Sequence, residues 1–389
     1  MQVHFRNTRR TEQIDGPLRV AQVLERLDVN PETVLVIHAG ELVTKDHLLP
    51  DDAEVELRPV ISGGAGPARC HACRAPSVIE VARHRAAYCA EHFVEHVRSQ
   101  VRAAIDRHGM LSYDDRVLVA VSGGKDSLAL WDVLLDMGYR ADGLYLGLGI
   151  GEYSDRSVRV AADFAAARGA RLRTVDLAEE HGFDIPQATA DRTRSSCGVC
   201  GLSKRYVFNR GALEHGYDVM ATGHNLDDEA ATLLGNVLRW QTPFLSRQSP
   251  VLPAAPGQLA RKVKPLYRLG EREMAAYCVI KGLDYVVEEC PLVGGNTVLR
   301  YKDALNELER QSPGTKAQFL FGFLDRVQPR HFTRDDADPD EVAPCAGCGM
   351  PTSVPRGRDA ASEALCAFCR TRSRLLRVAD GRRTPAGQR

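Results

Sequence analysis

At 389 residues the chain is long enough for two or three domains, each with its own buried core. Its 51 lysine and arginine residues equal its 51 aspartate and glutamate residues, so the overall charge neither indicates nor excludes a nucleic-acid partner. No apolar run approaches the roughly 18 residues that span a bilayer, and the amino terminus lacks the pattern of a secretory signal. We therefore expect a soluble cytoplasmic protein with no membrane partner.

Residues 1–64 are expected to form a small separate domain. Alternating and periodic apolar residues predict a strand, a helix and two more strands, over 2–6, 18–27, 33–37 and 54–61. This order resembles the β-grasp sulfur carriers of the ubiquitin-like type, in which a terminal Gly-Gly is converted to a thiocarboxylate. Gly63 and Gly64 stand at the equivalent place, but here the chain continues far beyond them. The domain is therefore cut after Gly64, or no longer carries sulfur, or ends in a flexible linker.

Residues 65–95 contain two ligand pairs with the spacing of a zinc finger. The four candidate ligands are Cys70, Cys73, Cys89 and His92. Gaps of two residues let both side chains of a pair reach one ion from a tight turn, which suits tetrahedral zinc. His71 is an alternative to His92, but two adjacent ligands would be strained.

The central domain, residues 96–333, is predicted to be α/β with a doubly wound parallel sheet. Val117–Val121 is a continuous apolar run typical of a buried parallel strand, and the glycines of Ser122–Ser127 allow a tight turn into a helix that is expected to begin at Ser127. Backbone N–H groups and a helix N-terminus then converge on one spot, which makes an anion site. Further strands are expected between helices, over 143–146, 172–176, 218–221 and 284–287.

Three cysteines of the central domain stand outside any complete zinc pattern. Cys197 and Cys200 open a predicted helix, and Cys290 follows the predicted strand at 284–287. Taken alone, the Cys197–Cys200 pair is compatible with zinc, redox chemistry or an iron–sulfur cluster. Three thiolates without a fourth would leave one iron of a cubane cluster open. Cys278, on the apolar face of a predicted helix, is expected to be a core residue.

The strand at 218–221 leads into Gly223 and a cluster of acidic residues. Asp227, Asp228 and Glu229 suit the first turn of a helix, where negative side chains are favourable. A capping role and a functional role therefore both stay open for Asp228.

Residues 334–374 are predicted to form a second zinc finger, and residues 375–389 a basic tail. The four candidate ligands are Cys345, Cys348, Cys366 and Cys369. Arginines that begin at Arg370 and continue into the tail could pair with phosphates, or could simply be a solvated end.

The Ser-Gly-Gly-x-Asp-Ser loop resembles that of the PP-loop ATP pyrophosphatases. Together with Cys197–Cys200, Gly223–Asp228, Cys290-Pro291 and both fingers, it resembles the TtuA-type tRNA 2-thiouridine synthetases over about residues 68–374. This resemblance implies the adenine nucleotide alpha hydrolase-like fold, with ATP, Mg²⁺, a [4Fe–4S] cluster and two Zn²⁺. It implies cluster ligation by Cys197, Cys200 and Cys290, and catalytic roles for Lys204 and Asp228. The implied ATP contacts are Ala120, Ser122, Gly123, Gly124, Lys125, Asp126, Ser127, Lys204 and Gly223.

The reaction that this resemblance implies is 2-thiolation of tRNA. ATP would adenylate the C2 oxygen of a uridine, and sulfur transferred by way of the cluster would then replace AMP. The implied partners are tRNA, a sulfur-donor system with an E1-like activating enzyme and a cysteine desulfurase, a protease that cuts after Gly64, and a second copy in a homodimer.

Three other functions stay open on the sequence alone. The first is thiolation of another tRNA nucleotide, either the wobble uridine or a cytidine. The second is an amide or lysidine-type PP-loop ligase, which would leave Cys197, Cys200 and Cys290 without a role. The third is a non-catalytic zinc-knuckle adaptor for RNA, which the intact phosphate loop and Asp228 argue against.

Overall fold

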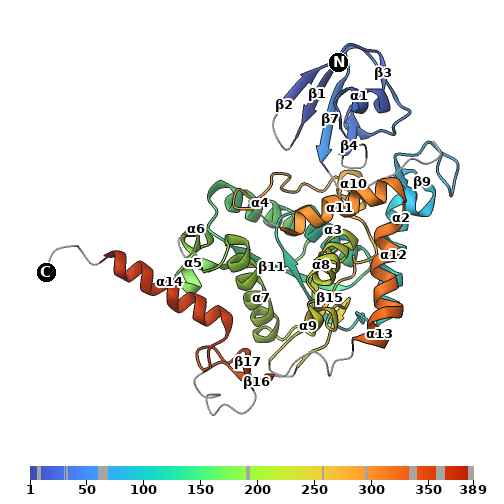
Figure 1. Ribbon diagram of the computed structural model, residues 1–389. Helices are drawn as coiled ribbons and strands as arrows, with labels where there is room; N and C mark the ends of the chain where they lie inside the picture. Colours follow the sequence, from blue (N-terminus) through green and yellow to red (C-terminus); the bar gives the residue numbers. More distant parts are fainter. Residues whose placement is uncertain are drawn as a thin grey trace.

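The computed structural model describes residues 1–6, 10–29, 31, 34–59, 69–189, 193–255, 258–293, 297–332, 340–355 and 364–383. The predicted carrier terminus, Gly63 and Gly64, lies outside the described residues. The amino-terminal region, drawn in blue, sits at one end of the central α/β body, and helix α14, drawn in red, projects from the other side (Figure 1). No described helix is both long and apolar enough to cross a membrane.

The central sheet has six strands in the order β12-β11-β10-β13-β15-β14, parallel except for the edge strand β14. The strands are β10 (Arg116–Val121), β11 (Arg140–Gly147), β12 (Leu172–Asp176), β13 (Val219–Thr222), β14 (Val251–Leu252) and β15 (Arg261–Val263). The chain winds from β10 through β11 and β12 in one direction, and through β13 and β15 in the other. The predicted doubly wound parallel sheet is therefore confirmed, and its direction reverses between β10 and β13. Ligands bind at the carboxyl ends of the strands at such a reversal.

Strand β10 is buried on both faces, which explains its continuous apolar sequence. Val117, Val119 and Val121 belong to one hydrophobic core, and Leu118 belongs to the core on the other face. The longer helices that surround the sheet are α2 (Ala90–His108), α3 (Lys125–Asp136), α4 (Gly151–Arg168), α7 (Ser196–Glu214), α8 (Leu226–Leu238), α10 (Glu271–Lys281), α11 (Thr297–Gln311) and α12 (Thr315–Gly322). Short helices are α5 (Leu177–His181), α6 (Ile185–Ala188), α9 (Thr242–Leu245) and α13 (Gln328–His331).

The amino-terminal region forms a five-stranded sheet in the order β2-β1-β7-β4-β5 with one helix. Its elements are β1 (Gln2–Phe5), β2 (Arg10–Gln13), α1 (Val20–Arg26), β4 (Val34–His38), β5 (Glu41–Leu42) and β7 (Glu54–Pro59), with β3 (Leu18–Arg19) paired to β6 (Leu48–Leu49). Strands β1 and β7 are parallel, and the other pairs of the sheet are antiparallel. Val34 and Val36 face the core of this region, whereas Leu35, Ile37 and Leu42 join the core of the central body, where β4 and β5 contact α10.

Each cysteine-rich segment combines a small hairpin with the start of a helix. The amino-terminal one contains β8 (Ile79–Val81), β9 (Ala86–Tyr88) and the first turn of α2. The carboxyl-terminal one contains β16 (Asp340–Pro344), β17 (Pro351–Pro355) and the first turn of α14 (Ala367–Arg383).

Three expected elements differ from the structure. The helix expected at 18–27 begins at Val20, because Leu18 and Arg19 pair with β6 as a strand. The helix after the phosphate loop begins at Lys125 rather than at Ser127. The prediction of a strand at 284–287 is wrong, because this segment pairs with no strand. Its contact with the site is a single hydrogen bond of 2.9 Å, which Val286 N donates to the Gly123 carbonyl.

A buried ion cluster fastens the amino-terminal finger to α10. The Glu273 carboxylate pairs with the Arg83 guanidinium, lies 3.1 Å from His96 Nε2, and accepts a 2.8 Å hydrogen bond from Gly270 N. Burial alone would raise the pKa of Glu273, but the charges and hydrogen bonds of Arg83 and His96 outweigh it and lower the pKa to about 2.

Replacing Glu273 by Gln should lower the free energy of unfolding by about 3–5 kcal/mol, because it leaves a buried guanidinium without its partner. The lowered pKa stabilises the fold fully above pH 4.5, the ordinary pKa of this group, and that contribution is lost as the pH falls toward 2. Urea denaturation of both proteins should therefore show a stability gap that narrows below pH 4.5. Glu307→Gln, which breaks a pair with Arg310 on the surface, should leave the midpoint unchanged. Equal stability of Glu273→Gln and the parent at pH 7 would contradict the anchoring role.

Candidate active site

The phosphate loop between β10 and α3 is held by close backbone contacts. Gly123 has a φ of +76°, and a Cβ atom there would lie 2.7 Å from the Ser157 carbonyl oxygen. Ser127 Oγ accepts a 3.1 Å hydrogen bond from Ser122 N and donates one of 2.9 Å to the Gly124 carbonyl. The loop is thus tied to α4 and to its own helix start, and Gly123 tolerates no side chain.

The loop that follows β13 lies directly against the phosphate loop. A Cβ atom at Gly223 would lie 2.9 Å from the Asp126 carbonyl oxygen, so the two backbones touch. Asn225 Nδ2 donates a 3.0 Å hydrogen bond to Asp126 Oδ1. Asn225 also caps α8 and exchanges hydrogen bonds of 3.1 and 3.2 Å with Asp228. Asp228 therefore has the capping role that its sequence position suggested, and it also reaches the site.

A cavity of about 700 Å³ opens at the carboxyl ends of β10 and β13. Seven of the residues predicted from the sequence line it, namely Ala120, Ser122, Asp126, Ser127, Lys204, Gly223 and Asp228. Its far wall comes from α7 and from the carboxyl-terminal finger, through Met350 and Phe368. The Phe368 ring stacks on Tyr206 of α7 with centroids 3.8 Å apart, which fixes that wall.

Charged side chains form a partly buried network beside the phosphate loop. Lys125 Nζ lies 2.6 Å from Glu271 Oε1 and 3.1 Å from Asp126 Oδ2, so its ammonium is held within the protein and does not line the cavity. Lys302 Nζ lies 2.7 Å from Asp228 Oδ1 and 3.0 Å from Glu271 Oε2. Sequence reasoning missed Glu271 and Lys302, because neither carries a local motif. The two ammonium groups face three carboxylates, which leaves a net charge of −1.

Burial and pairing act in opposite directions on these carboxylates. Burial raises the pKa of Asp126 to about 6, and the Lys125 ammonium only partly offsets this. Burial would also raise the pKa of Asp228 and Glu271, but Lys302 lowers the first, and Lys125 with Lys302 lowers the second to about 2. Asp228 and Glu271 are therefore held as carboxylates, and Asp126 is ionised above its raised pKa of about 6.

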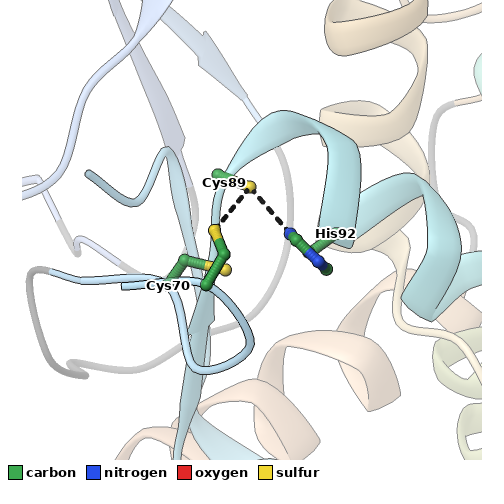
Figure 2. Close-up of side chains that lie close together, drawn as sticks. Cys70, Cys89 and His92 are labelled. Carbon is green, nitrogen blue, oxygen red and sulfur yellow. Dashed lines mark hydrogen bonds between the residues drawn. The ribbon is translucent and has the colours of Figure 1, made fainter. Parts of the chain in front are cut away.

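The amino-terminal finger brings its four predicted ligands together. The ligand atoms of Cys70, Cys73, Cys89 and His92 all lie within 4.8 Å of one another. Cys89 Sγ is 3.8 Å from Cys73 Sγ and 3.2 Å from His92 Nδ1. Figure 2 shows Cys70 in the finger loop turned toward Cys89 and His92 at the start of α2. His71 lies outside this set, as the sequence argument preferred.

The carboxyl-terminal finger gathers a second set of four ligands. The sulfur atoms of Cys345, Cys348, Cys366 and Cys369 also lie within 4.8 Å of one another, and Cys348 Sγ is 3.7 Å from Cys366 Sγ. Both sets can therefore hold a metal ion.

The three cysteines predicted to bind the iron–sulfur cluster lie less close together than the ligands of either finger. Cys197 Sγ lies 3.8 Å from the carbonyl oxygen of Leu292, two residues after Cys290. Burial raises the pKa of Cys200, Lys204 opposes that rise, and the neighbouring Cys290 and Cys197 add to it. The three thiols are partly buried and unbridged, but among the described residues they form no third set within 4.8 Å. Cys278, as predicted, is a buried core residue.

Comparison with known proteins assigns the family. Residues 93–292 match the family model described as a PP-loop domain. The tRNA-5-methyluridine(54) 2-sulfurtransferase of Thermus thermophilus is 48% identical over 314 residues, which cover 81% of this chain and 94% of that protein. This chain belongs to the PP-loop tRNA sulfurtransferases. The protein of the same name from Pyrococcus horikoshii is 40% identical over 78% of this chain and 93% of its own length.

A solved structure supports the fold of this PP-loop tRNA sulfurtransferase. The U34-tRNA thiolase NcsA from Methanococcus maripaludis matches with a TM-score of 0.61 and 24% identity, over 69% of this chain and 91% of that one. Membership of the family sets aside the non-catalytic adaptor and the amide or lysidine-type ligase, since the chain is a tRNA sulfurtransferase with an ATP-binding PP-loop.

Gly223→Ala should weaken ATP binding at least tenfold, because the added methyl group would lie 2.9 Å from the Asp126 carbonyl and displace the phosphate loop. Isothermal titration with ATP measures this. Gly322→Ala in α12 is the matched control, because nothing lies within 4 Å of a Cβ atom there, and it should keep the parental affinity. Parental ATP affinity in a folded Gly223→Ala protein would show that the two loops need not touch.

Proposed function

We propose that this tRNA sulfurtransferase replaces the C2 oxygen of 5-methyluridine at tRNA position 54 with sulfur. The observation that carries the proposal is that relatives 48% and 40% identical, with 94% and 93% of their lengths covered, are both named for that nucleotide. The wobble uridine is the second candidate. It is favoured by the fold match to the U34 thiolase, but the identity to that protein is 24%.

The first step joins the uridine to AMP. The C2 oxygen attacks the α-phosphorus of ATP, and the bond from that phosphorus to the bridging oxygen of pyrophosphate breaks. The backbone N–H groups that follow Ser122 in this loop and those at the start of α3 stabilise the phosphate charge. Lys204 lines the same cavity and contributes a compact ammonium.

The partly buried network fits a magnesium ion beside ATP. Asp126 and Asp228 line the cavity and offer the carboxylate oxygens that Mg²⁺ prefers. The network carries one negative charge in excess, which a cation would offset. Asp228, held ionised by Lys302, is our candidate for assisting the reaction with Lys204.

The second step exchanges the activated oxygen for sulfur. A sulfur nucleophile attacks C2, the C2–O bond breaks, and AMP leaves with the oxygen. AMP leaves far more readily than hydroxide, and the cavity holds both reactants together. Cys197, Cys200 and Cys290 fit the ligands of an iron–sulfur cluster, since all three are unbridged and the other two thiols and Lys204 are near enough to Cys200 to shift its pKa. These three thiolates would hold a [4Fe–4S] cluster of the kind named for NcsA, and the cluster would supply an iron without a protein ligand that could carry the sulfur.

Cys290→Ala should abolish thiolation and lower the iron content while leaving ATP affinity within about twofold, because it removes one ligand and no ATP contact. Anaerobic purification, iron and sulfide analysis, and chromatography of tRNA nucleosides measure the three quantities. Cys278→Ala removes a core cysteine outside the ligand set and should keep its iron. Parental thiolation by the Cys290→Ala protein would remove Cys290 from the mechanism.

We propose that each finger holds one zinc ion. The donor sets are Cys₃His in Cys70, Cys73, Cys89 and His92, and Cys₄ in Cys345, Cys348, Cys366 and Cys369. Closed four-ligand sets of this kind are typical of structural zinc. The second ion would stabilise the wall of the cavity that Phe368 forms.

The amino-terminal region is our candidate for a ubiquitin-like sulfur carrier with a β-grasp fold. Its support is the mixed five-stranded sheet with parallel β1 and β7 and one helix. Its last strand is also close to the reaction site. The Arg58 guanidinium lies 5.7 Å from the centroid of the Tyr285 ring, and the next residue, Val286, donates to Gly123 in the phosphate loop.

Mass spectrometry of the protein from its native host, under conditions in which tRNA is thiolated, tests this assignment. We expect a fragment that ends at Gly64, with a fraction that carries sulfur in place of one terminal oxygen, because a glycine within the chain has no carboxylate to activate. Cells that lack the E1-like enzyme or the cysteine desulfurase should yield the fragment without sulfur. Full-length chain alone, alongside thiolated tRNA, would rule out a free Gly64. The domain boundaries, the homodimer and the cytoplasmic location stay predictions.

A further inference from the structure

Two cations of the cavity have no role in the reaction described above. Lys262 comes from β15 and Arg205 from α7, and both line the cavity. Lys262 is in parallel register with Met220 of β13, and both side chains reach the cavity, whereas the guanidinium of neighbouring Arg261 bonds to the Gly109 carbonyl elsewhere. The two cations therefore converge on one space from different elements.

Neither cation forms an ion pair with a carboxylate in the described part of the chain, and the negative group that acts on Arg205 is the Cys200 thiol. The carboxylate whose charge acts on Lys262 is Glu229. It already forms an ion pair with Lys264 Nζ at 2.7 Å and accepts a 3.0 Å hydrogen bond from Gln248 Nε2. Burial lowers the pKa of Lys262 to about 8, and the charges of Lys264 and Arg205 add to this. A half-buried ammonium without a counter-ion is unfavourable, and a bound anion would compensate it.

The position of the pair separates it from the ATP phosphates. The phosphate loop follows β10, whereas Lys262 lies two strands away on β15, where it is paired with Leu252 of the edge strand β14. A base that reacts in this cavity must be turned out of the RNA stack, and its flanking phosphates enter with it. Phosphate contacts then fix the position of the nucleotide.

We propose that Lys262 and Arg205 form an anion subsite that binds a phosphodiester of the RNA beside the reacting nucleotide. This inference rests on the proposed function, because the ligand of the subsite is the tRNA substrate. It would orient the base toward the activated phosphate, which makes Lys262 and Arg205 positioning residues rather than catalytic ones.

Lys262→Met and Arg205→Met test the subsite through binding of unthiolated tRNA and of ATP, each measured over a range of salt. We expect about tenfold weaker tRNA binding for each variant, a salt slope reduced by about one, and unchanged ATP affinity. Lys262→Arg, which keeps the positive charge that Lys262→Met removes, should retain most of the parental tRNA affinity. Arg261→Met is the matched control, since it removes the same charge one residue away on the same strand, and it should bind tRNA as the parent does.

The remaining outcomes overturn the proposal. Weaker ATP binding with parental tRNA binding would place the subsite on the nucleotide phosphates. An equal loss of tRNA affinity in Arg261→Met would show that the effect comes from overall charge. Parental tRNA affinity in folded Lys262→Met and Arg205→Met proteins would show that there is no subsite. Failure of the proposed function would be a separate result, in which the parent protein binds tRNA and ATP but thiolates no uridine.

Discussion

The first turn of α10 carries two carboxylates that are shielded from water, Glu273 fully and Glu271 in large part, and the need to pair both of them organises the molecule. A buried charge without a partner is costly, so each carboxylate requires cations from distant parts of the chain. Glu271 is satisfied by Lys125 of the phosphate loop and Lys302 of α11. Glu273 is satisfied by Arg83 of the amino-terminal finger and by His96 of α2. One helix end thus sets the position of the loop, the finger and two further helices.

Two kinds of charge meet in the cavity beside the phosphate loop. Asp126 and Asp228 belong to a network with an excess of carboxylates, whereas α7 and β15 contribute Lys204, Arg205 and Lys262. The cation site and the RNA-phosphate site that we propose above both follow from this combination of charges.

The sequence predicts those parts of the site whose residues are close together in the chain. The run Val117–Val121 with its following glycines identifies the phosphate loop, and fixed cysteine spacing identifies both fingers. Glu271 and Lys302 could not be found this way, because they are polar residues on helices and acquire a role only through pairing across the fold. The segment Tyr285–Val287 has the composition of a strand, but its backbone partner is the single residue Gly123. The residue pattern of a short segment does not show whether it forms one backbone hydrogen bond or the full series of a β-sheet strand.

The docking of the amino-terminal region did leave a signal in the sequence. Val34–Ile37 is apolar without alternation, which is typical of a strand covered on both faces, and Leu35 and Ile37 are indeed buried against the central body. The described contacts between this region and the central body include β4 and β5 on α10 and the Arg58 guanidinium over the Tyr285 ring. A covalently linked domain has an effective local concentration in the millimolar range, so even weak contacts keep it docked. The carrier function that we propose above adds a second requirement, because a carrier must leave the site after delivery. Cleavage of the covalent link would remove the high local concentration and so favour that release.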